Sequence, residues 1–160
     1  MRARPRFARS RNGLGLMTAK TFAIASDHAG TELKAALKAL LEEQGVTVLD
    51  LGTDGPASVD YPNYADAVAA ALADGRAEAG VLICGTGIGI SIAANRHRHV
   101  RAALCHDITT ARLCRQHNDA NVLVLGARIV GLEVARDCTL AFLSTPYEGG
   151  RHARRVAMLG

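Results

Sequence analysis

The sequence has no tryptophan, and only 4% of its 160 residues are aromatic. The hydrophobic core must therefore be built from Ala, Val, Leu and Ile, as in helix-covered parallel sheets, whose buried strands are aliphatic. So few aromatic side chains also exclude a wide stacking surface for nucleic acid bases. The chain contains no run of about 18 apolar residues, the length that a transmembrane helix needs. We therefore expect neither nucleic acid nor a membrane among its partners.

The cysteine pattern lacks both a CxxC pair and any spacing typical of a metal site. The four cysteines are Cys84, Cys105, Cys114 and Cys138. Scattered cysteines of this kind are free thiols in a reducing compartment. We therefore expect a cytoplasmic protein with no structural disulfide and no metal.

Positive charge is concentrated at the N-terminus. Residues 1–16 contain five arginines and no acidic residue, so residues 17–160 carry a net charge of −1 although the whole chain carries +4. The segment is Arg-rich like a transit peptide but lacks the apolar face that such peptides need. We expect residues 1–18 to form a disordered extension. Residues 19–160 then form a single domain, because a 49% hydrophobic chain of this length suffices for one core only.

Apolar runs of strand length alternate with segments of helical periodicity along the chain. The expected strands span residues 22–25, 46–51, 81–84, 102–105 and 122–125. The expected helices span residues 33–41, 64–72, 87–95, 109–117 and 132–143, with a polar loop over residues 52–62. This alternation is typical of a parallel sheet covered by helices. We therefore predict an α/β fold, a three-layer α/β/α sandwich around a five-stranded parallel, Rossmann-like sheet.

Ionisable side chains follow two of the predicted strands. The first strand runs into SDHAG, which holds Asp27 and His28, and the third runs into CGTGIG at residues 84–89. In open α/β sheets, ligands bind outside the carboxyl ends of the strands. These two segments are therefore the first candidates for a site, and the Asp27 carboxylate is placed to orient the His28 ring.

The glycine-rich loop matches neither common nucleotide-binding motif. Ile90 stands where the Rossmann fingerprint needs its third glycine, and no Lys-Ser/Thr pair follows as in a Walker A loop. Gly85, Gly87 and Gly89 instead favour exposed backbone N–H groups at a helix N-terminus, which can bind an oxyanion. Such a helix end also favours the thiolate form of Cys84, which makes this cysteine a candidate base or nucleophile. The alternative is that Cys84 has only a packing role, because free cysteines are often buried in the core.

Histidines and arginines in the second half of the chain provide further candidates. His97 and His99 lie in the basic stretch NRHRHVR, where we expect a solvated turn and no metal site. His117 lies at a predicted helix end, where its role can be limited to favouring the C-terminal dipole. Arg151 and Arg155 are spaced i, i+4 on one face of a predicted terminal helix. Two guanidinium groups on one face can bind the oxygens of a phosphate. The alternative is that this C-terminal segment is a solvated basic tail.

Five motifs together resemble one family. They are SDHAG (26–30), DYPNYA (60–65), ICGTGIGISIAANR (83–96), RQHNDANVLVLGAR (115–128) and YEGGRHARR (147–155). In order and spacing they resemble the type B ribose-5-phosphate isomerases, which belong with the allose- and galactose-phosphate isomerases. The resemblance covers the chain from residue 21 to the C-terminus and leaves out only the Arg-rich start.

The resemblance implies an aldose–ketose isomerase that acts through an enediolate, without a metal or an organic cofactor, as a homodimer or tetramer with shared active sites. Cys84 would be the base that moves a proton between two carbons, and the amides of the glycine-rich loop would hold the oxyanion. Thr86 would shuttle protons between substrate oxygens, and His117 would open the furanose ring. The implied substrate-binding residues are Gly85, Gly87 and Gly89 for the oxyanion, Asp27 and Asn118 for the sugar hydroxyls, His28, Arg151 and Arg155 for the phosphate, and Arg128 from the neighbouring chain.

Three functions are compatible with these residues. The first is interconversion of ribose 5-phosphate and ribulose 5-phosphate. The second is isomerisation of another sugar phosphate, such as allose 6-phosphate, galactose 6-phosphate or a tetrose phosphate, since pocket length decides between these substrates. The third is a nucleotide-binding module without catalysis, which would bind adenine nucleotides tightly and turn over no phosphosugar.

Overall fold

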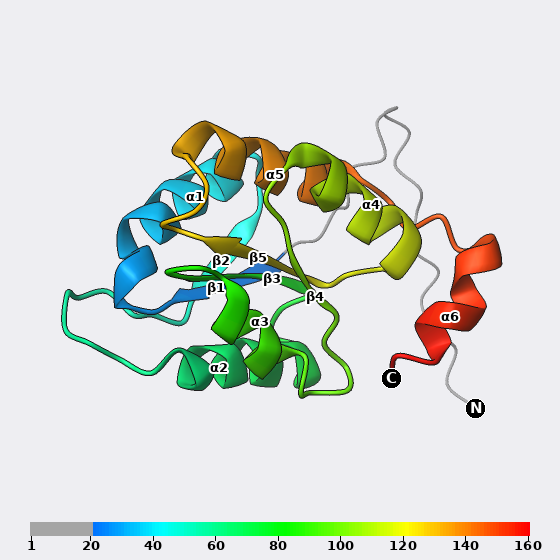
Figure 1. The fold of residues 1–160 in the computed structure, drawn as a ribbon, viewed down its shortest axis with the longest axis horizontal. Helices are drawn as coiled ribbons and strands as arrows, with labels where there is room; N and C mark the ends of the chain where they lie inside the picture. Colours follow the sequence, from blue (N-terminus) through cyan, green and yellow to red (C-terminus); the bar gives the residue numbers. More distant parts are fainter. Residues whose placement is uncertain (1–20) are drawn as a thin grey trace.

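The computed structural model describes residues 21–160, and the predicted Arg-rich extension over residues 1–18 lies outside that range. Five strands form one parallel sheet in the order β2-β1-β3-β5-β4 (Figure 1). The strands are β1 (Thr21–Ser26), β2 (Thr47–Asp50), β3 (Ala79–Cys84), β4 (Ala102–Leu104) and β5 (Val122–Gly126). Each overlaps one of the five predicted strands, so the predicted parallel sheet is confirmed.

Helices cover both faces of the sheet, as predicted for a three-layer sandwich. Figure 1 shows one layer made of α1 (Thr31–Glu43), α4 (Ile108–Asn118) and α5 (Leu132–Ser144). The opposite layer contains α2 (Tyr61–Ala73) and α3 (Ile88–Ala94). The short elements are η1 (His28–Gly30), η2 (Gly150–His152) and α6 (Ala153–Ala157). Among residues 21–160, no helix has the length and apolar character needed to cross a membrane.

Alternation of side chains along the strands divides the core into two parts. Phe22 and Ile24 of β1 pack toward α1 and α5, whereas Ala23 and Ala25 pack toward α2. Every residue of β3 and β5 is buried, as is typical of central strands in a parallel sheet. Phe22 meets Phe142 edge to face at 6.3 Å between ring centroids, within a core that is otherwise mostly aliphatic.

The order of the strands changes direction next to β1. The chain passes from β1 to β2 on one side and then crosses to β3 on the other. Ser26, the last residue of β1, pairs with Ile83, the residue before Cys84. The carboxyl ends of β1 and β3 therefore open side by side, at the switch point where ligands bind in such sheets.

The start of α2 differs from the prediction. Residues 52–62 were expected to form a polar loop, but the helix already begins at Tyr61. Pro62 lies in the first helical turn, where its missing N–H removes no intrahelical hydrogen bond. The proline therefore starts the helix rather than ending a loop.

The predicted terminal helix is divided into two short elements. Arg151 lies in the 3-10 helix η2, and Arg155 lies in α6, which follows without a break. Gly149 and Gly150 before them have φ angles of 64° and 54°, which side chains rarely adopt. The expected single helix is therefore wrong, and the two arginines lie on successive short turns.

Gly80 of β3 provides a test of how closely α2 lies on the sheet. A Cβ at Gly80 would lie 2.8 Å from Val68 Cγ1 of α2 and 3.3 Å from the carbonyl oxygen of Ala23. Val68 is buried and β-branched, so it cannot rotate away at low cost. We predict that Gly80→Ala lowers the free energy of unfolding by about 1–3 kcal/mol. Equilibrium denaturation measures this value.

Gly55→Ala is the matched control, because a Cβ there would meet no atom within 4 Å. We expect its stability to stay within about 0.5 kcal/mol of the parent. Equal stabilities for the two variants would show that α2 tolerates a side chain beneath it.

Candidate active site

Cys84 is the last residue of β3, and its buried sulfur receives a hydrogen bond from the loop that follows. The backbone N–H of Gly87 donates to Cys84 Sγ at 3.1 Å. Gly87 has a φ of 77°, and a Cβ there would lie 2.5 Å from Leu104 Cδ1, so only glycine fits this turn. The turn aims an amide hydrogen at the sulfur, which stabilises negative charge on it. Gly87 was predicted to hold a substrate oxyanion. That role stays a prediction, and in the structure its amide is directed at Cys84 Sγ.

The remaining loop residues have separate environments. Thr86 is exposed, and its Oγ1 accepts a hydrogen bond from the Ile88 amide at 3.2 Å. Gly89 lies in the first turn of α3, where a Cβ would lie 2.5 Å from Cζ of Tyr61. Packing against the Tyr61 ring therefore accounts for the missing side chain at Gly89.

The loop after β5 packs directly against the glycine-rich loop. Ala127 donates its N–H to the Cys84 carbonyl, and Arg128 donates its N–H to the Gly85 carbonyl, both at 2.9 Å. The Arg128 side chain lies over Gly85, whose Cβ, if present, would be 3.2 Å from Nη1. Arg128 was expected to reach the site from a neighbouring chain. The residue follows β5, and its side chain lies beside the end of β3 in its own chain. A contribution of Arg128 to the site of a neighbouring chain stays a prediction.

Asp27 and His28 lie next to Cys84. The Asp27 N–H donates to the Ile83 carbonyl at 3.1 Å, and its carboxylate accepts from the Ala29 amide at 3.0 Å. His28 Nδ1 accepts a hydrogen bond from the Val59 amide at 3.2 Å. An accepting Nδ1 carries no proton, so the neutral ring is protonated at Nε2. His28 is therefore prepared to donate one hydrogen bond to a ligand.

A buried lysine fixes the loop that contacts His28. Lys34 Nζ of α1 lies 2.7 Å from both Asp50 Oδ1 and Asp54 Oδ1, and the side chain is only 3% exposed. The Gly52 amide also donates to Asp50 at 3.0 Å. This network could not be predicted from the sequence, because a lysine on a helix is usually solvated.

This network shifts the pKa values of both partners. Burial alone would lower the pKa of Lys34, but hydrogen bonds and the charges of Asp50 and Asp54 outweigh it and raise the pKa above 10.5. Burial alone would raise the pKa of Asp50, but the Lys34 hydrogen bond, the Gly52 amide and the positive charges of Lys34 and Lys38 lower it below 3.8. The charged pair is therefore favoured by folding across the neutral pH range.

The other predicted site residues lie at the opposite edge of the sheet. His117 and Asn118 end α4, and β5 begins shortly after them at Val122. Val122 pairs with Gly80 at the start of β3, whereas Cys84 lies four residues further along that strand. Four residues of strand correspond to roughly 13 Å. The predicted site is thus divided into a Cys84 end and a His117 end within one chain. Figure 1 shows α4 and the sheet that contains β3.

The turn after His117 is held by buried charge. Asp119 adopts the left-handed conformation with φ of 47°, which is uncommon for a residue other than glycine. Arg115 Nη1 lies 2.9 Å from Asp119 Oδ1, and Arg101 Nε donates to the Asp119 carbonyl at 2.9 Å. Arg115 is buried and also lies over the Phe142 ring. The i, i+4 spacing of Arg115 and Asp119 is the feature of the sequence from which this ion pair could have been predicted.

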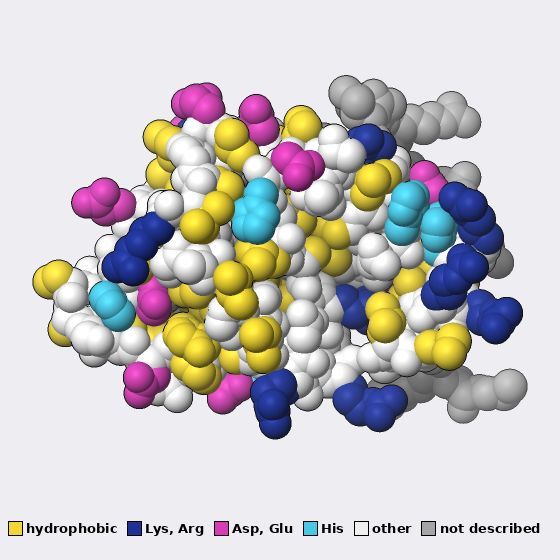
Figure 2. Space-filling model, in the orientation of Figure 1, with side chains coloured by type: hydrophobic (Ala, Val, Ile, Leu, Met, Phe, Trp, Pro, Cys, Tyr) yellow, Lys and Arg dark blue, Asp and Glu magenta, His cyan; other side chains and the backbone are white. Residues whose placement is uncertain are grey.

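The C-terminal segment packs against His117. The rings of His117 and His152 are stacked, with centroids 4.4 Å apart and planes 18° from parallel. Figure 2 shows histidine side chains beside a group of basic side chains at this end of the molecule. Arg151 and Arg155 belong to the same segment and are exposed. Both arginines were predicted site residues, whereas His152, which stands between them in the YEGGRHARR motif, was not.

His117, Glu148 and His152 place their ligand atoms within 4.8 Å of one another. A shared metal ion must lie in the plane of each coordinating imidazole, along the lone pair of its nitrogen. Two rings that stack face to face direct their lone pairs side by side rather than toward one point. The arrangement therefore fits ring stacking and does not fit a metal centre.

His97 and His99 are not simply solvated, contrary to expectation. His97 Nε2 lies 2.7 Å from Asp66 Oδ1, and His99 Nε2 lies 2.7 Å from the Ala69 carbonyl oxygen. Both contacts connect the turn before β4 to α2. The two histidines therefore have a structural role away from Cys84.

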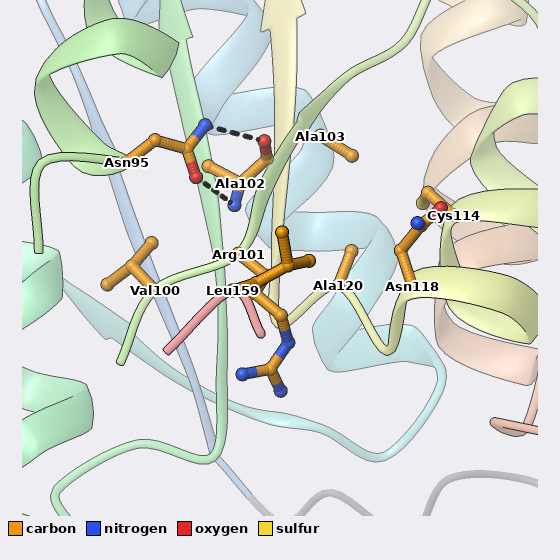
Figure 3. Close-up of a pocket in the computed structure, with 9 residues that line it drawn as sticks. All are labelled: Asn95, Val100, Arg101, Ala102, Ala103, Cys114, Asn118, Ala120 and Leu159. Carbon is orange, nitrogen blue, oxygen red and sulfur yellow. Dashed lines mark hydrogen bonds between the residues drawn. The ribbon is translucent and has the colours of Figure 1, made fainter. Parts of the chain in front are cut away.

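A cavity of about 430 Å³ lies at the His117 end, between α3, β4 and α4 (Figure 3). Asn118 and Cys114 line one side, and Asn95 on another side exchanges two hydrogen bonds with the backbone of Ala102. Leu159 from the C-terminus also lines it. Cys84 is not among its lining residues, so this cavity does not contain the candidate base.

A family model described as Ribose/Galactose Isomerase matches residues 22–159. The chain belongs to the ribose/galactose isomerase family. The chain is 51% identical over 137 residues to "Ribose-5-phosphate isomerase B" of Escherichia coli (strain K12), covering 86% of this chain and 92% of that protein. It is 40% identical to "D-erythrulose-4-phosphate isomerase" of Pectobacterium atrosepticum over 141 residues, covering 88% of this chain and 93% of that protein.

Solved structures of ribose/galactose isomerases show the same fold. A crystal structure of a ribose 5-phosphate isomerase from Thermotoga maritima matches with a TM-score of 0.85 and 51% identity. The match covers 87% of this chain and 96% of that one. The chain is therefore an isomerase with the α/β sandwich of this family.

Removing Lys34 tests the network beneath His28. We predict that Lys34→Met lowers the free energy of unfolding by about 2 kcal/mol at pH 7, because Asp50 loses its main buried partner. The Asp50 contribution is present above pH 3.8 and is lost as the pH falls through its lowered folded value. The Lys34 contribution is present below pH 10.5 and is lost as the pH rises through its raised folded value.

Denaturation of the parent and the variant at several pH values measures this difference. It should be constant between about pH 5 and 9 and should shrink at both extremes. Lys38→Met is the control, since Lys38 Nζ lies 3.7 Å from Asp50 and the side chain is 37% exposed. A pH-independent difference for Lys34→Met would contradict the ion pair.

Proposed function

We propose that the protein interconverts ribose 5-phosphate and ribulose 5-phosphate through an enediolate, with Cys84 as the base. The observation that carries the proposal is the Gly87 amide directed at Cys84 Sγ at the open end of the sheet. The names of the E. coli and T. maritima relatives support the substrate. The four free thiols suit a reducing cytoplasm, where we place the enzyme.

The isomerisation moves one proton between neighbouring carbons. The Cys84 thiolate takes the proton from C2 of the aldose, and the electron pair moves to O1 to give the enediolate. The thiol then returns a proton to C1, while Thr86 moves a proton between O2 and O1. Arg128 beside Gly85 and the N–H groups of the loop offset the charge that develops on oxygen. These steps need neither a metal nor an organic cofactor.

The residues around Cys84 and those around His117 would divide the substrate between them. Asp27 and the neutral His28 ring lie at the Cys84 end, where they bind a hydroxyl and donate to the phosphate. His117 opens the furanose ring and Asn118 binds a hydroxyl. Arg151 and Arg155 bind the phosphate, whose oxygens suit guanidinium donors.

A second copy of the chain would bring these two ends together. A pentose phosphate is too short to extend from Cys84 to His117 across one sheet. In a two-fold homodimer, the Cys84 end of each copy would face the His117 end of its partner. The dimer would then contain two equivalent sites, each built from both copies. Tetramers would pair such dimers.

Exposed hydrophobic side chains support an interface beside Cys84. Ile88 and Ile92 of α3 are 53% and 61% exposed, and Ile129 of the adjoining loop is 56% exposed. Figure 2 shows hydrophobic side chains gathered on this face over α3. Exposed patches of this kind mark interaction sites in soluble proteins.

The P. atrosepticum relative favours a second candidate, a tetrose phosphate. Both substrates would use the same base and differ in the length that the phosphate site must accommodate. A panel of ribose 5-phosphate, erythrose 4-phosphate, allose 6-phosphate and galactose 6-phosphate decides between them by kcat/KM. A nucleotide-binding module would instead bind adenine nucleotides and isomerise none of the panel.

Substitution of Cys84 tests the base. We predict that Cys84→Ser and Cys84→Ala keep the fold and lower kcat for ribose 5-phosphate by about 10²–10⁴-fold, because a serine hydroxyl is a far weaker base than a thiolate. Assays in the presence of a chelator measure turnover of the parent and the variants. Full activity with chelator is expected for the parent.

Cys138→Ala is the control for loss of a thiol, since burial raises the pKa of Cys138 to about 11 and the residue packs in the core. It should retain kcat despite lower stability. Near-normal turnover by Cys84→Ser would exclude Cys84 as the base.

Mixing two impaired variants tests the shared site. We predict that Cys84→Ala is nearly inactive and that His117→Ala is limited to sugar that opens spontaneously, whereas co-expressed chains regain about one quarter of the parent activity. Half of the dimers would then be mixed, and each mixed dimer has one site with both residues intact. Light scattering and differently tagged chains confirm that mixed dimers form. Mixed dimers without activity would place the whole site in one chain.

A further inference from the structure

We propose that His152 is a positioning residue that orients His117 for ring opening, an inference that rests on the proposed function. Its imidazole stacks on the His117 ring at 4.4 Å between centroids, with 18° between the planes. The two residues come from different elements, the end of α4 and the junction of η2 and α6. The stack is therefore a tertiary contact formed next to a candidate catalytic group.

His152 is held firmly enough to act as a platform. The residue is only 8% exposed, and its backbone N–H donates to the Gly149 carbonyl at 3.0 Å. The segment is also joined to α4, because the Glu148 N–H donates to the Gln116 carbonyl at 3.1 Å, next to His117. The C-terminal segment thus follows any movement of the end of α4.

The ring of His152, rather than its polar atoms, makes the contact with His117. Among the residues that the structure describes, no hydrogen-bond partner exists for His152 Nε2, and the Glu148 carboxylate is 3.5 Å away. A histidine retained for hydrogen bonding would be expected to have a partner in a buried position. The geometry instead points to a flat surface that covers one face of His117.

Covering one face restricts the side-chain rotation of His117. The residue lies in the last turn of α4 and is only partly buried, so without the stack its ring would have more freedom. A proton-transfer group must stay within hydrogen-bond reach of the atom that it serves, and small displacements cost large factors in rate. The stack leaves the ring edge of His117 free to reach a furanose oxygen while its orientation is fixed.

The same contact connects ring opening to phosphate binding. His152 directly follows Arg151, and Arg155 lies three residues later. A platform fixed against His117 therefore also fixes the start of the segment that carries both arginines. The phosphate and the ring oxygen of one substrate are then held by a single unit.

The test compares a ring-forming substrate with one that stays open. Ribose 5-phosphate closes a furanose through O4, whereas 4-deoxyribose 5-phosphate lacks that hydroxyl and has its O5 blocked by phosphate. Only the first substrate needs ring opening. We expect His152→Asn, which removes the ring and keeps a polar side chain, to lower kcat/KM for ribose 5-phosphate by about tenfold or more. The loss on the open-chain analogue should be under about threefold.

His152→Phe is the matched variant, because it keeps a flat ring and removes both nitrogens. It should recover kcat/KM for ribose 5-phosphate to within about threefold of the parent. A merely structural role predicts equal losses on both substrates, in proportion to the folded fraction, for either variant. Equal losses, or no loss in His152→Asn, would overturn the proposal.

A second measurement decides the case in which the analogue is a poor substrate. The part of the rate on ribose 5-phosphate that exceeds spontaneous ring opening should rise linearly with enzyme concentration for the parent, because the parent opens the ring itself. With His152→Asn, the slope of that rise per folded enzyme should be about tenfold lower. An unchanged slope in the variant would refute the positioning role. Lack of turnover by the parent on every phosphosugar would instead refute the proposed function.

Discussion

The parallel direction of all five strands determines where each functional residue lies. A residue that follows a strand comes to the carboxyl edge of the sheet, and a residue that precedes a strand comes to the amino edge. Asp27 and Arg128 follow β1 and β5, Cys84 ends β3, and the three residues gather at one edge. His117 precedes β5 and lies at the other edge. The separation of Cys84 and His117 is set by the length of the strands and not by the loops. The proposed site therefore needs a second copy of the chain.

Close backbone approach gives the Cys84 end its rigidity. A Cβ at Gly126 would overlap the carbonyl of Thr86, and one at Gly87 would strike Leu104. The two loops that surround Cys84 are therefore packed on each other without intervening side chains. In such an arrangement the sulfur and the amide that donates to it keep their geometry before a substrate arrives, and this preorganisation is what electrostatic stabilisation requires.

Much of the fold could be predicted because it depends on local patterns. The aliphatic runs around Ile24, Val81 and Val124 are fully buried, so their sequence signal was strong. The start of α2 was misjudged because Pro62 also suits a loop, and only its place in the first turn distinguishes the two. Motifs in the sequence identify the candidate residues, but they do not predict how these residues are arranged in space. The position of Arg128 over Gly85 and the stack of His152 on His117 both depend on contacts between distant segments.

The hydrogen bond from the Val59 amide to His28 Nδ1 limits what His28 can offer a phosphate in the proposed site. With Nδ1 occupied as an acceptor, His28 offers the phosphate a neutral donor and no positive charge. The charge of a bound phosphate ester would then be balanced largely by Arg151 and Arg155 of the second copy. In the proposed dimer, binding and association would be linked equilibria, so that a sugar phosphate would favour the assembled form by the same free energy with which assembly favours its binding.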